Sequence, residues 1–144
     1  MEILTYIIIT CISSLGLLAG VIVGRCARDE LRDARRFFPV MQAILAGVIF
    51  AIVIGSRIEQ YSLPFSVIAA CIVSFASFRL PYPVAWYALF ALLLSVASQT
   101  VHLPTIAGLI FLHGLAQGST EKSWKAVLPI MVAFISVAIA AALV

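Results

Sequence analysis

The stretch ILTYIIITCISSLGLLAGVIVGRCARDELRDARRFF, from Ile3 to Phe38, decides the class of this protein. Its first part, Ile3–Gly24, contains no charged residue. A helix needs about 20 residues to cross roughly 30 Å of hydrocarbon, and this part is long enough. Its second part carries five arginines, which are Arg25, Arg28, Arg32, Arg35 and Arg36. Basic residues beside a span resist translocation, so the pattern predicts a membrane helix that ends in the cytoplasm.

The rest of the chain divides into five further apolar stretches. These are Val40–Ser56, Leu63–Phe78, Tyr82–Gln99, Leu103–Gly118 and Trp124–Val144. The composition is 64% hydrophobic and 10% charged, and the mean hydropathy is +1.19. A soluble domain of 144 residues has no core large enough for so many apolar side chains. We therefore predict a single all-α polytopic membrane domain over residues 1–144, with six transmembrane helices.

The basic residues predict how this domain is oriented. Eight of the nine Lys and Arg residues fall on one side of the six-span arrangement, because Arg79, Lys122 and Lys125 join the five arginines. Arg57 alone falls on the other side. This distribution predicts a cell-membrane protein with both termini outside and the arginine-rich loop in the cytoplasm. Two of the spans are short, and a five-span alternative merges them, but it spoils the segregation of charge and ranks second.

The segment Arg25–Phe38 is the one long polar stretch. Apolar residues recur through it at steps of four and three, which predicts a short cytoplasmic amphipathic helix between the first two spans. These residues are Ala27, Leu31, Ala34, Phe38 and Met41. The five arginines have two interpretations. In the first, they bind anionic lipid headgroups or a phosphorylated ligand. In the second, they only fix the topology and solvate a connecting helix.

Small residues recur at every fourth position on three of the predicted helices. They are Gly16, Gly20 and Gly24 on the first, Ala43, Gly47, Ala51 and Gly55 on the second, and Gly114 and Gly118 on the fifth. Small side chains at this spacing let helix backbones approach closely in a membrane. Packing within one subunit and packing between subunits explain the pattern equally well at this stage.

Internal symmetry is a further hypothesis. Six spans divide into two sets of three, which would be inverted relative to each other, as in many transporters. The strings Ala46–Phe50 and Ala107–Phe111 are related. So low a sequence complexity produces such matches easily, and the hypothesis of an inverted repeat rests on them alone.

Polar residues inside the predicted spans are few, and His113 is the one titratable group expected near mid-depth. An ionisable residue at that depth is a functional candidate. The candidates for a polar pathway are His102, Thr105, His113 and Gln117 on one stripe of the fifth helix, with Ser95 and Gln99 on the fourth. In this interpretation His113 is a proton-sensitive group. The alternative is a neutral histidine hydrogen-bonded between helices.

Patterns typical of other functions are absent from the sequence. No carboxylate pair lies in a span, no zinc-ligand spacing occurs, and no nucleophile elbow, phosphate-binding loop or dinucleotide motif is found. We therefore predict no enzyme activity, no metal, no cofactor and no nucleic-acid partner. The predicted partners are membrane lipids and either further copies of the chain or another membrane protein.

Three functions follow in order. The first is a homo-oligomeric transporter or channel for a small solute or ion. The second is a non-catalytic subunit or assembly factor of a larger membrane complex. The third is an intramembrane enzyme in which a serine or cysteine lies within hydrogen-bond reach of His113.

Overall fold

The computed structural model describes residues 3–27, 29–57, 62–80, 82–121 and 123–142. In these ranges the chain is helical and forms no strand. The long helices are α1 (Ile3–Cys26), α3 (Phe38–Gly55), α4 (Ser62–Arg79), α5 (Pro83–Ala97), α6 (Leu103–Thr120) and α7 (Trp124–Ala142). A single turn, α2 (Leu31–Ala34), and a 3-10 turn, η1 (Arg35–Phe37), lie between α1 and α3.

The helix ends agree with the predicted spans to within about two residues at every described boundary. The physical reason is local, because a proline stands in the first turn of α3, α5 and α6. A proline there loses no hydrogen bond, since the first N–H groups of a helix lack partners within it. The start of α7 follows Ser123, whose Oγ accepts a hydrogen bond of 3.2 Å from the backbone N–H of Lys125.

Three helices are long and apolar enough to cross a membrane by length and composition, namely α1, α3 and α7. Helices of this kind indicate a membrane protein. Within the described residues, α4 and α5 contain shorter apolar segments, Pro64–Arg79 and Pro83–Ala97. Helix α6 is less apolar because it carries His113, Gln117 and several glycine and hydroxyl residues.

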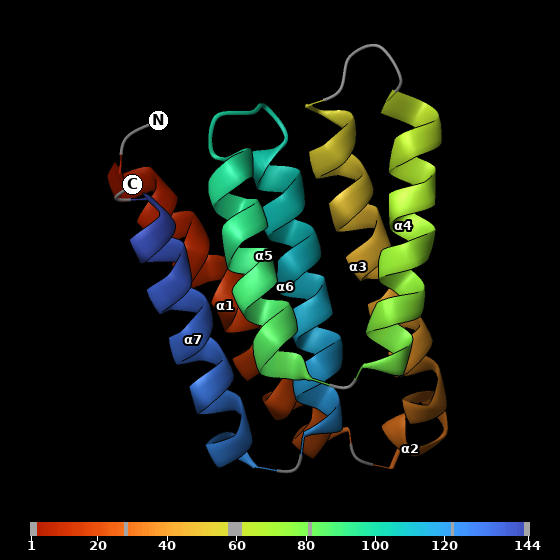
Figure 1. Ribbon diagram of the computed structural model, residues 1–144. Helices are drawn as coiled ribbons and strands as arrows, with labels where there is room; N and C mark the ends of the chain where they lie inside the picture. Colours follow the sequence, from red (N-terminus) through yellow and green to blue (C-terminus); the bar gives the residue numbers. More distant parts are fainter. Residues whose placement is uncertain (1–2, 28, 58–61, 81, 122, 143–144) are drawn as a thin grey trace.

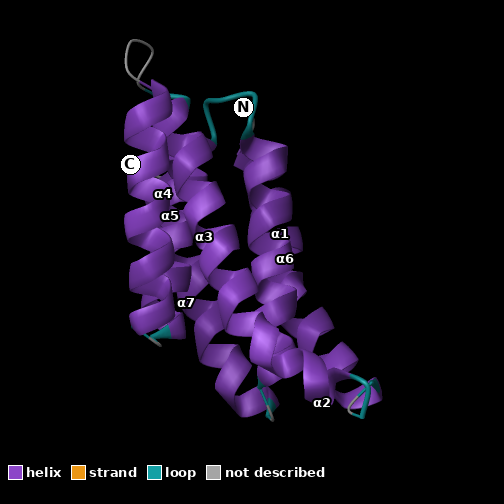
Figure 2. Cartoon of the chain, turned by 90° about the vertical axis from the view of Figure 1, so that its right-hand side faces the viewer, coloured by secondary structure: helices purple, strands orange, loops and turns teal. Residues whose placement is uncertain are grey.

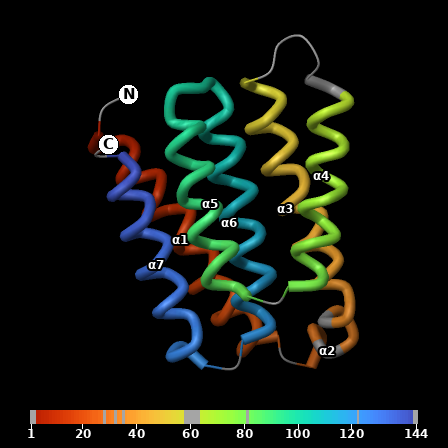
Figure 3. The backbone as a smooth tube through the Cα atoms, in the orientation of Figure 1, coloured from red at the N-terminus to blue at the C-terminus, as the bar shows by residue number. Residues whose placement is uncertain are grey.

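Successive long helices run in opposite directions, so that both described chain ends lie at the same end of the bundle (Figure 1). We call this the terminal end; α3 ends there, α4 begins there, and the α5–α6 connection is also there. The opposite end, which we call the arginine end, holds α2 and the α4–α5 and α6–α7 connections (Figure 3). Arg25, Arg79 and Lys125 therefore lie at or beside the arginine end, and Arg57 lies at the terminal end.

The helices associate mainly in three pairs, which are α1 with α6, α3 with α4, and α5 with α7. Contacts of α6 with α3 and of α1 with α7 join the pairs into one bundle, and α4 lies at its edge against α3 (Figures 1 and 2). An inverted repeat would make the pair α5–α3 equivalent to α1–α6. Helix α5 touches α3 only slightly, so the packing departs from the pattern of an inverted repeat.

The glycines of α1 lie directly against the backbone of α6. A Cβ atom on Gly24 would stand 2.7 Å from the carbonyl oxygen of Ser119. Cβ atoms on Gly16 and Gly20 would overlap the carbonyl oxygens of Phe111 and Leu115. The Oγ of Ser119 also donates a hydrogen bond of 3.2 Å to the carbonyl oxygen of Gly20. The first glycine stripe thus packs inside the chain.

The matching glycines of α6 face α1 from the other side. A Cβ atom on Gly114 would stand 2.9 Å from the backbone nitrogen of Leu17, and one on Gly118 would overlap the carbonyl oxygen of Leu17. Both glycines are buried. The two helices therefore meet backbone to backbone, at a separation that no larger side chain permits.

The small-residue stripe of α3 faces α4. A Cβ atom on Gly47 would overlap the side chain of Ser74 and stand 2.7 Å from the carbonyl oxygen of Ala70. Gly55 has more room, because the nearest atom is the Cβ of Ser66 at 3.9 Å. Ala43 is buried and Ala51 is half-buried. This stripe also makes contacts within the chain.

The segment predicted as an amphipathic helix forms two short turns instead. Helix α1 continues to Cys26, and α2 and η1 then lead directly into α3. The interruption lies between Cys26 and Leu31, because α2, η1 and α3 follow one another without a gap. Pro39 has no N–H to donate to the carbonyl of Arg35, where the chain forms η1. The guanidinium of Arg25 lies 5.1 Å from the ring centroid of Trp124. Arg28 and the side chains of Arg32 and Arg35 lie outside the described part of the structure.

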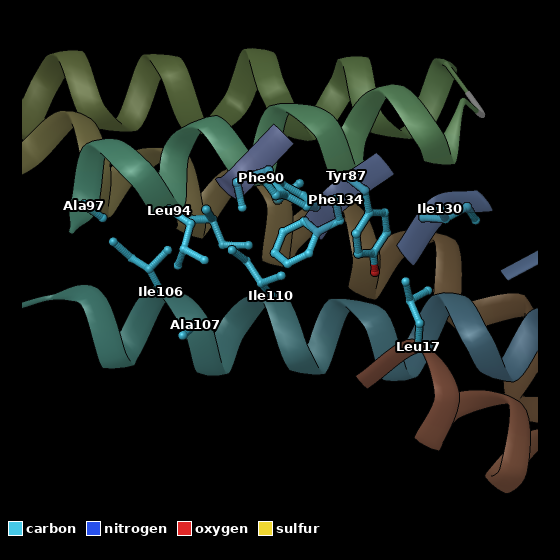
Figure 4. Packing of buried hydrophobic residues seen from close by; sticks show 14 of the residues in the cluster. Leu17, Tyr87, Phe90, Leu94, Ala97, Ile106, Ala107, Ile110, Ile130 and Phe134 are labelled. Carbon is cyan, nitrogen blue, oxygen red and sulfur yellow. The ribbon is translucent and has the colours of Figure 1, made fainter. Parts of the chain in front are cut away.

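The apolar core fills the space between α1, α3, α5, α6 and α7, and Figure 4 shows part of it. Its largest fully buried side chains include Tyr87, Phe90, Phe134, Leu94, Ile106 and Ile110. The Tyr87 ring meets Phe90 edge-on at 5.7 Å and Phe134 edge-on at 6.0 Å between ring centroids. This core positions the one buried histidine described next.

Candidate functional site

His113 lies on α6 and is buried, with 4% of its surface exposed. Its Nδ1 is 3.2 Å from the hydroxyl oxygen of Tyr87 on α5. Its ring also packs edge-on against Phe90, with ring centroids 4.9 Å apart. Tyr87 reaches from α5 toward α6 through the aromatic core (Figure 4). The imidazole is therefore held by one hydrogen bond and two aromatic rings.

A cavity of about 330 Å³ opens beside His113 toward the arginine end, and we call it the His113 cavity. Residues from four helices and two connections line it. They are Pro39, Gln42, Ser77, Phe78, Leu80, Tyr82, Pro83, Trp86, His113, Gln117, Thr120 and Glu121. The cavity lies where α4 and α6 end and where α3 and α5 begin.

Polar groups follow one line along the α6 side of this cavity. The Nε2 of Gln117 donates a hydrogen bond of 3.1 Å to Oε1 of Glu121, and the Oγ1 of Thr120 donates one of 2.7 Å to the carbonyl oxygen of Gln117. On α5, the indole N–H of Trp86 donates a hydrogen bond of 3.0 Å to the carbonyl oxygen of Leu80. The cavity thus combines ordered polar groups with aromatic walls.

Sequence reasoning missed Gln42, Trp86 and Glu121 as lining residues. A signal existed for one of them. Glu121 stands four residues after Gln117 and eight after His113, so it continues the stripe of α6 just past the predicted span. Gln42 and Trp86 come from other helices, and their meeting with α6 depends on tertiary packing.

The predicted stripe does not form one continuous pathway. His102 and Thr105 are exposed at the terminal end of α6, while His113 is buried and Gln117 lies in the His113 cavity. The stripe therefore passes from the outside of the bundle into its interior. Only its second half contributes to a cavity that contains His113.

Ser95 and Gln99 belong to a different site. With Tyr6 they line a cavity of about 250 Å³ at the terminal end, which we call the Tyr6 cavity. The Oγ of Ser95 donates a hydrogen bond of 3.0 Å to the carbonyl oxygen of Ala141, and the hydroxyl of Tyr6 donates one of 3.3 Å to that of Ala138. Both bonds satisfy carbonyl groups in the last turns of α7.

An apolar layer separates the two cavities. Helix α5 runs from Trp86 in the His113 cavity to Ser95 in the Tyr6 cavity. Phe90 and Leu94 lie between these points and are fully buried, as is Ile110 of α6 (Figure 4). The two cavities consequently approach each other from opposite ends of the bundle without joining.

The surroundings of His113 bear on the enzyme hypothesis. Among the described residues, the hydrogen bond of its side chain is to Tyr87 and not to a serine or cysteine. The three cysteines, Cys11, Cys26 and Cys71, are exposed on the outside of the bundle. No group of three or more His, Cys, Asp or Glu residues in the described part could hold a metal ion.

Comparisons of the chain with protein-family models, with curated proteins and with solved structures found no match.

Proposed function

We propose that this protein is a membrane transporter or channel for a small polar solute, with the His113 cavity as its binding chamber. One observation carries the proposal: a cavity lined by Gln42, Gln117 and Glu121 reaches a buried histidine inside a bundle of apolar helices. Polar groups inside a membrane bundle are energetically expensive and mark solute pathways. A protein needed only for packing has no use for such a chamber.

We also propose that all six long helices cross the membrane, with the arginine end in the cytoplasm. The alternation of helix direction supports this, because it brings Arg25, Arg79 and Lys125 to one end. The exposed guanidinium groups of Arg25 and Arg36 are suitably placed there to contact anionic headgroups. The His113 cavity then opens toward the cytoplasm, and the Tyr6 cavity opens toward the outside.

Transport in this scheme requires opening of the layer around Phe90 and Leu94. The most direct movement separates α5 from α6, because few of their backbone positions approach closely and side chains fill the space between them, while α1 and α6 meet backbone to backbone. Helix α5 would move together with α7, against which it packs closely. Such a rigid-body shift exchanges access between the two cavities.

The experiment uses thiol blockage in liposomes. Cys11, Cys26 and Cys71 are replaced by serine, and Ser77→Cys is introduced in the His113 cavity. Uptake of methylammonium, guanidinium, acetate and glycerol is measured before and after a charged, membrane-impermeant thiol reagent is added to the arginine end. Modification should stop the flux of the transported solute. Val101→Cys, at an exposed position of the terminal end, is the control: with the reagent applied to the terminal end instead, it should react without loss of flux. Flux of all four solutes equal to that of protein-free liposomes contradicts the proposal.

A second candidate function is a non-catalytic subunit or assembly factor, and helix α4 favours it. This helix packs on α3 and presents Phe65, Ile68, Ile72 and Phe75 on its exposed side. Since the glycine stripes are used within the chain, the α4 face is the surface that we propose for contacts with further copies or with another membrane protein. Cys71 lies on the same helix and is exposed.

Cross-linking distinguishes these partners. A bifunctional thiol reagent is applied to membranes carrying a variant with Cys11→Ser and Cys26→Ser, so that Cys71 alone reacts. A product of twice the chain mass supports a homo-oligomer. A product of another mass supports the subunit alternative, and no product with Cys71 contradicts the α4 face as a contact surface. The variant that lacks all three cysteines is the control.

A further inference from the structure

We propose that the solute held in the His113 cavity is a small organic cation, such as an alkylammonium or guanidinium ion. This inference rests on the transport function proposed above and adds the chemical class of the solute. Three features of the cavity support it: the charge of its wall, the helix ends that meet there and the aromatic side chains that line it.

The formal charge on the cavity wall is negative. Among the described lining residues, Glu121 is the acidic one and none is Lys or Arg. Arg79 follows the lining residue Phe78 in the sequence but does not line the cavity. Its guanidinium lies 5.4 Å from the ring centroid of Phe75. One carboxylate oxygen of Glu121 accepts from Gln117, and a carboxylate has about four lone-pair sites in all. Glu121 therefore retains acceptor capacity for an ammonium or guanidinium N–H.

The helix ends at the cavity reinforce this preference. Helix α6 ends at Thr120, so its last carbonyl groups bring partial negative charge to the same wall as Glu121. Helices α3 and α5 begin at the cavity, and their N-termini contribute partial positive charge. Each has a proline in its first turn, Pro39 and Pro83, and so lacks one of the N–H donors that would bind an anion. The full charge of Glu121 consequently sets the sign of the site.

Aromatic rings supply a second kind of contact for a cation. Phe78, Tyr82 and Trp86, from α4, the α4–α5 connection and α5, line the same cavity as Glu121. A cation over such a ring gains about 0.5–2 kcal/mol, and an indole is the best of the three. The volume of about 330 Å³ lies near the lower end of the range of about 300–1,000 Å³ for ligand pockets, which limits the solute to a small one.

Binding is tested on the full chain in detergent with Trp86 as the reporter. Trp124→Phe leaves Trp86 as the single tryptophan, and its fluorescence is titrated with guanidinium, urea, methylammonium and acetate at millimolar concentrations. Guanidinium and urea have nearly the same planar shape but differ in charge. We expect guanidinium and methylammonium to bind at least about tenfold more tightly than urea or acetate. Glu121→Gln should weaken cation binding by about tenfold, and Glu121→Asp should keep most of it.

The outcomes separate the solute class from the function itself. Equal binding of urea and guanidinium, tighter binding of acetate, or Glu121→Gln binding cations as the parent does, each overturns the cation inference and leaves the transport function standing. No response to any of the four solutes, together with unblocked flux after modification of Ser77→Cys, overturns both. Thermal unfolding of each Glu121 variant is measured first, and if Glu121→Gln is unfolded, Glu121→Asp and Gln117→Leu carry the comparison.

Discussion

The hydroxyl oxygen of Tyr87 and the Nδ1 of His113 lie 3.2 Å apart, on two helices whose backbones approach closely at few positions. Tyr87 is fully buried and His113 nearly so. Each residue therefore provides the hydrogen-bond partner that the polar group of the other needs in an apolar interior. The pair joins α5 to α6 at the boundary between the His113 cavity and the aromatic core.

We first predict the effect of breaking this pair. Tyr87→Phe removes the hydroxyl and leaves the Nδ1 of His113 without its partner, so the free energy of unfolding should fall by about 1–3 kcal/mol. Tyr82→Phe is the matched control, because Tyr82 is 66% exposed, and it should change stability by less than about 0.5 kcal/mol. Reversible unfolding in mixed detergent measures both values. Equal effects of the two substitutions would contradict the role of the pair.

The α1–α6 contact leads to a second prediction. Gly20→Ala places a methyl group onto the carbonyl oxygen of Leu115, and overpacking of this kind destabilises by about 1–3 kcal/mol. Gly108→Ala is the control on the same pair of helices, since nothing lies within 4 Å of its added Cβ. It should be neutral or stabilising by up to about 1 kcal/mol, because alanine favours helix over glycine.

The same two variants also test where the glycine face is used. Both should keep the oligomer size of the parent in mild detergent, because the face packs inside the chain. A shift of Gly20→Ala alone to a smaller species would show that the face joins subunits instead. Size-exclusion chromatography with light scattering measures this directly.

The helices were predictable from the sequence because the signals for them are local. Apolar stretches, the arginines after Ile3–Gly24 and the prolines in first turns each act within a few residues of the helix end that they determine. The exception is the segment after Arg25. Its apolar spacing predicts one helix, but the chain leaves the helix after Cys26 and becomes helical again at Leu31, and spacing alone does not indicate such a break.

The candidate site was only half predictable. His113 and Gln117 share one helix face, and helical spacing gives that relationship directly. Ser95 and Gln99 were expected to face the outer part of the same stripe but lie in the Tyr6 cavity, because α5 packs mainly on α7. The close backbone contacts of the glycines determine which helices become neighbours. A pattern of small residues on one helix does not show which helix packs against it.

A third prediction concerns orientation in the membrane. Single cysteines are placed at Gln99, at the terminal end, and at Ser123, at the arginine end, in a chain whose native cysteines are replaced by serine. The positive-inside rule predicts that Gln99→Cys reacts with an impermeant thiol reagent applied to intact cells, whereas Ser123→Cys reacts only after the cells are opened. The reverse labelling pattern would place the His113 cavity on the outside, and labelling of both in intact cells would contradict six membrane spans.

The fourth prediction separates a transport role of His113 from a packing role. The imidazole lines the buried inner end of the cavity and contacts Tyr87 and Phe90. His113→Gln keeps an acceptor for the Tyr87 hydroxyl, so the free energy of unfolding should change by less than about 1 kcal/mol. Glutamine lacks the ring and has one more rotatable bond than histidine, so it does not hold a polar group rigidly at the inner end of the cavity. Guanidinium flux in liposomes should therefore fall by about tenfold, which corresponds to about 1.4 kcal/mol.

His102 provides the matched control for this substitution. It lies on the same helix but is exposed at the terminal end, outside both cavities. His102→Gln should leave flux and stability unchanged, because surface substitutions away from specific contacts usually stay within about 0.5 kcal/mol. If His113→Gln lowers stability and leaves flux at the level of His102→Gln, His113 is a packing residue. The chamber would then have to act through Gln117 and Glu121 alone, and the same flux assay on Gln117→Leu would decide whether it acts at all.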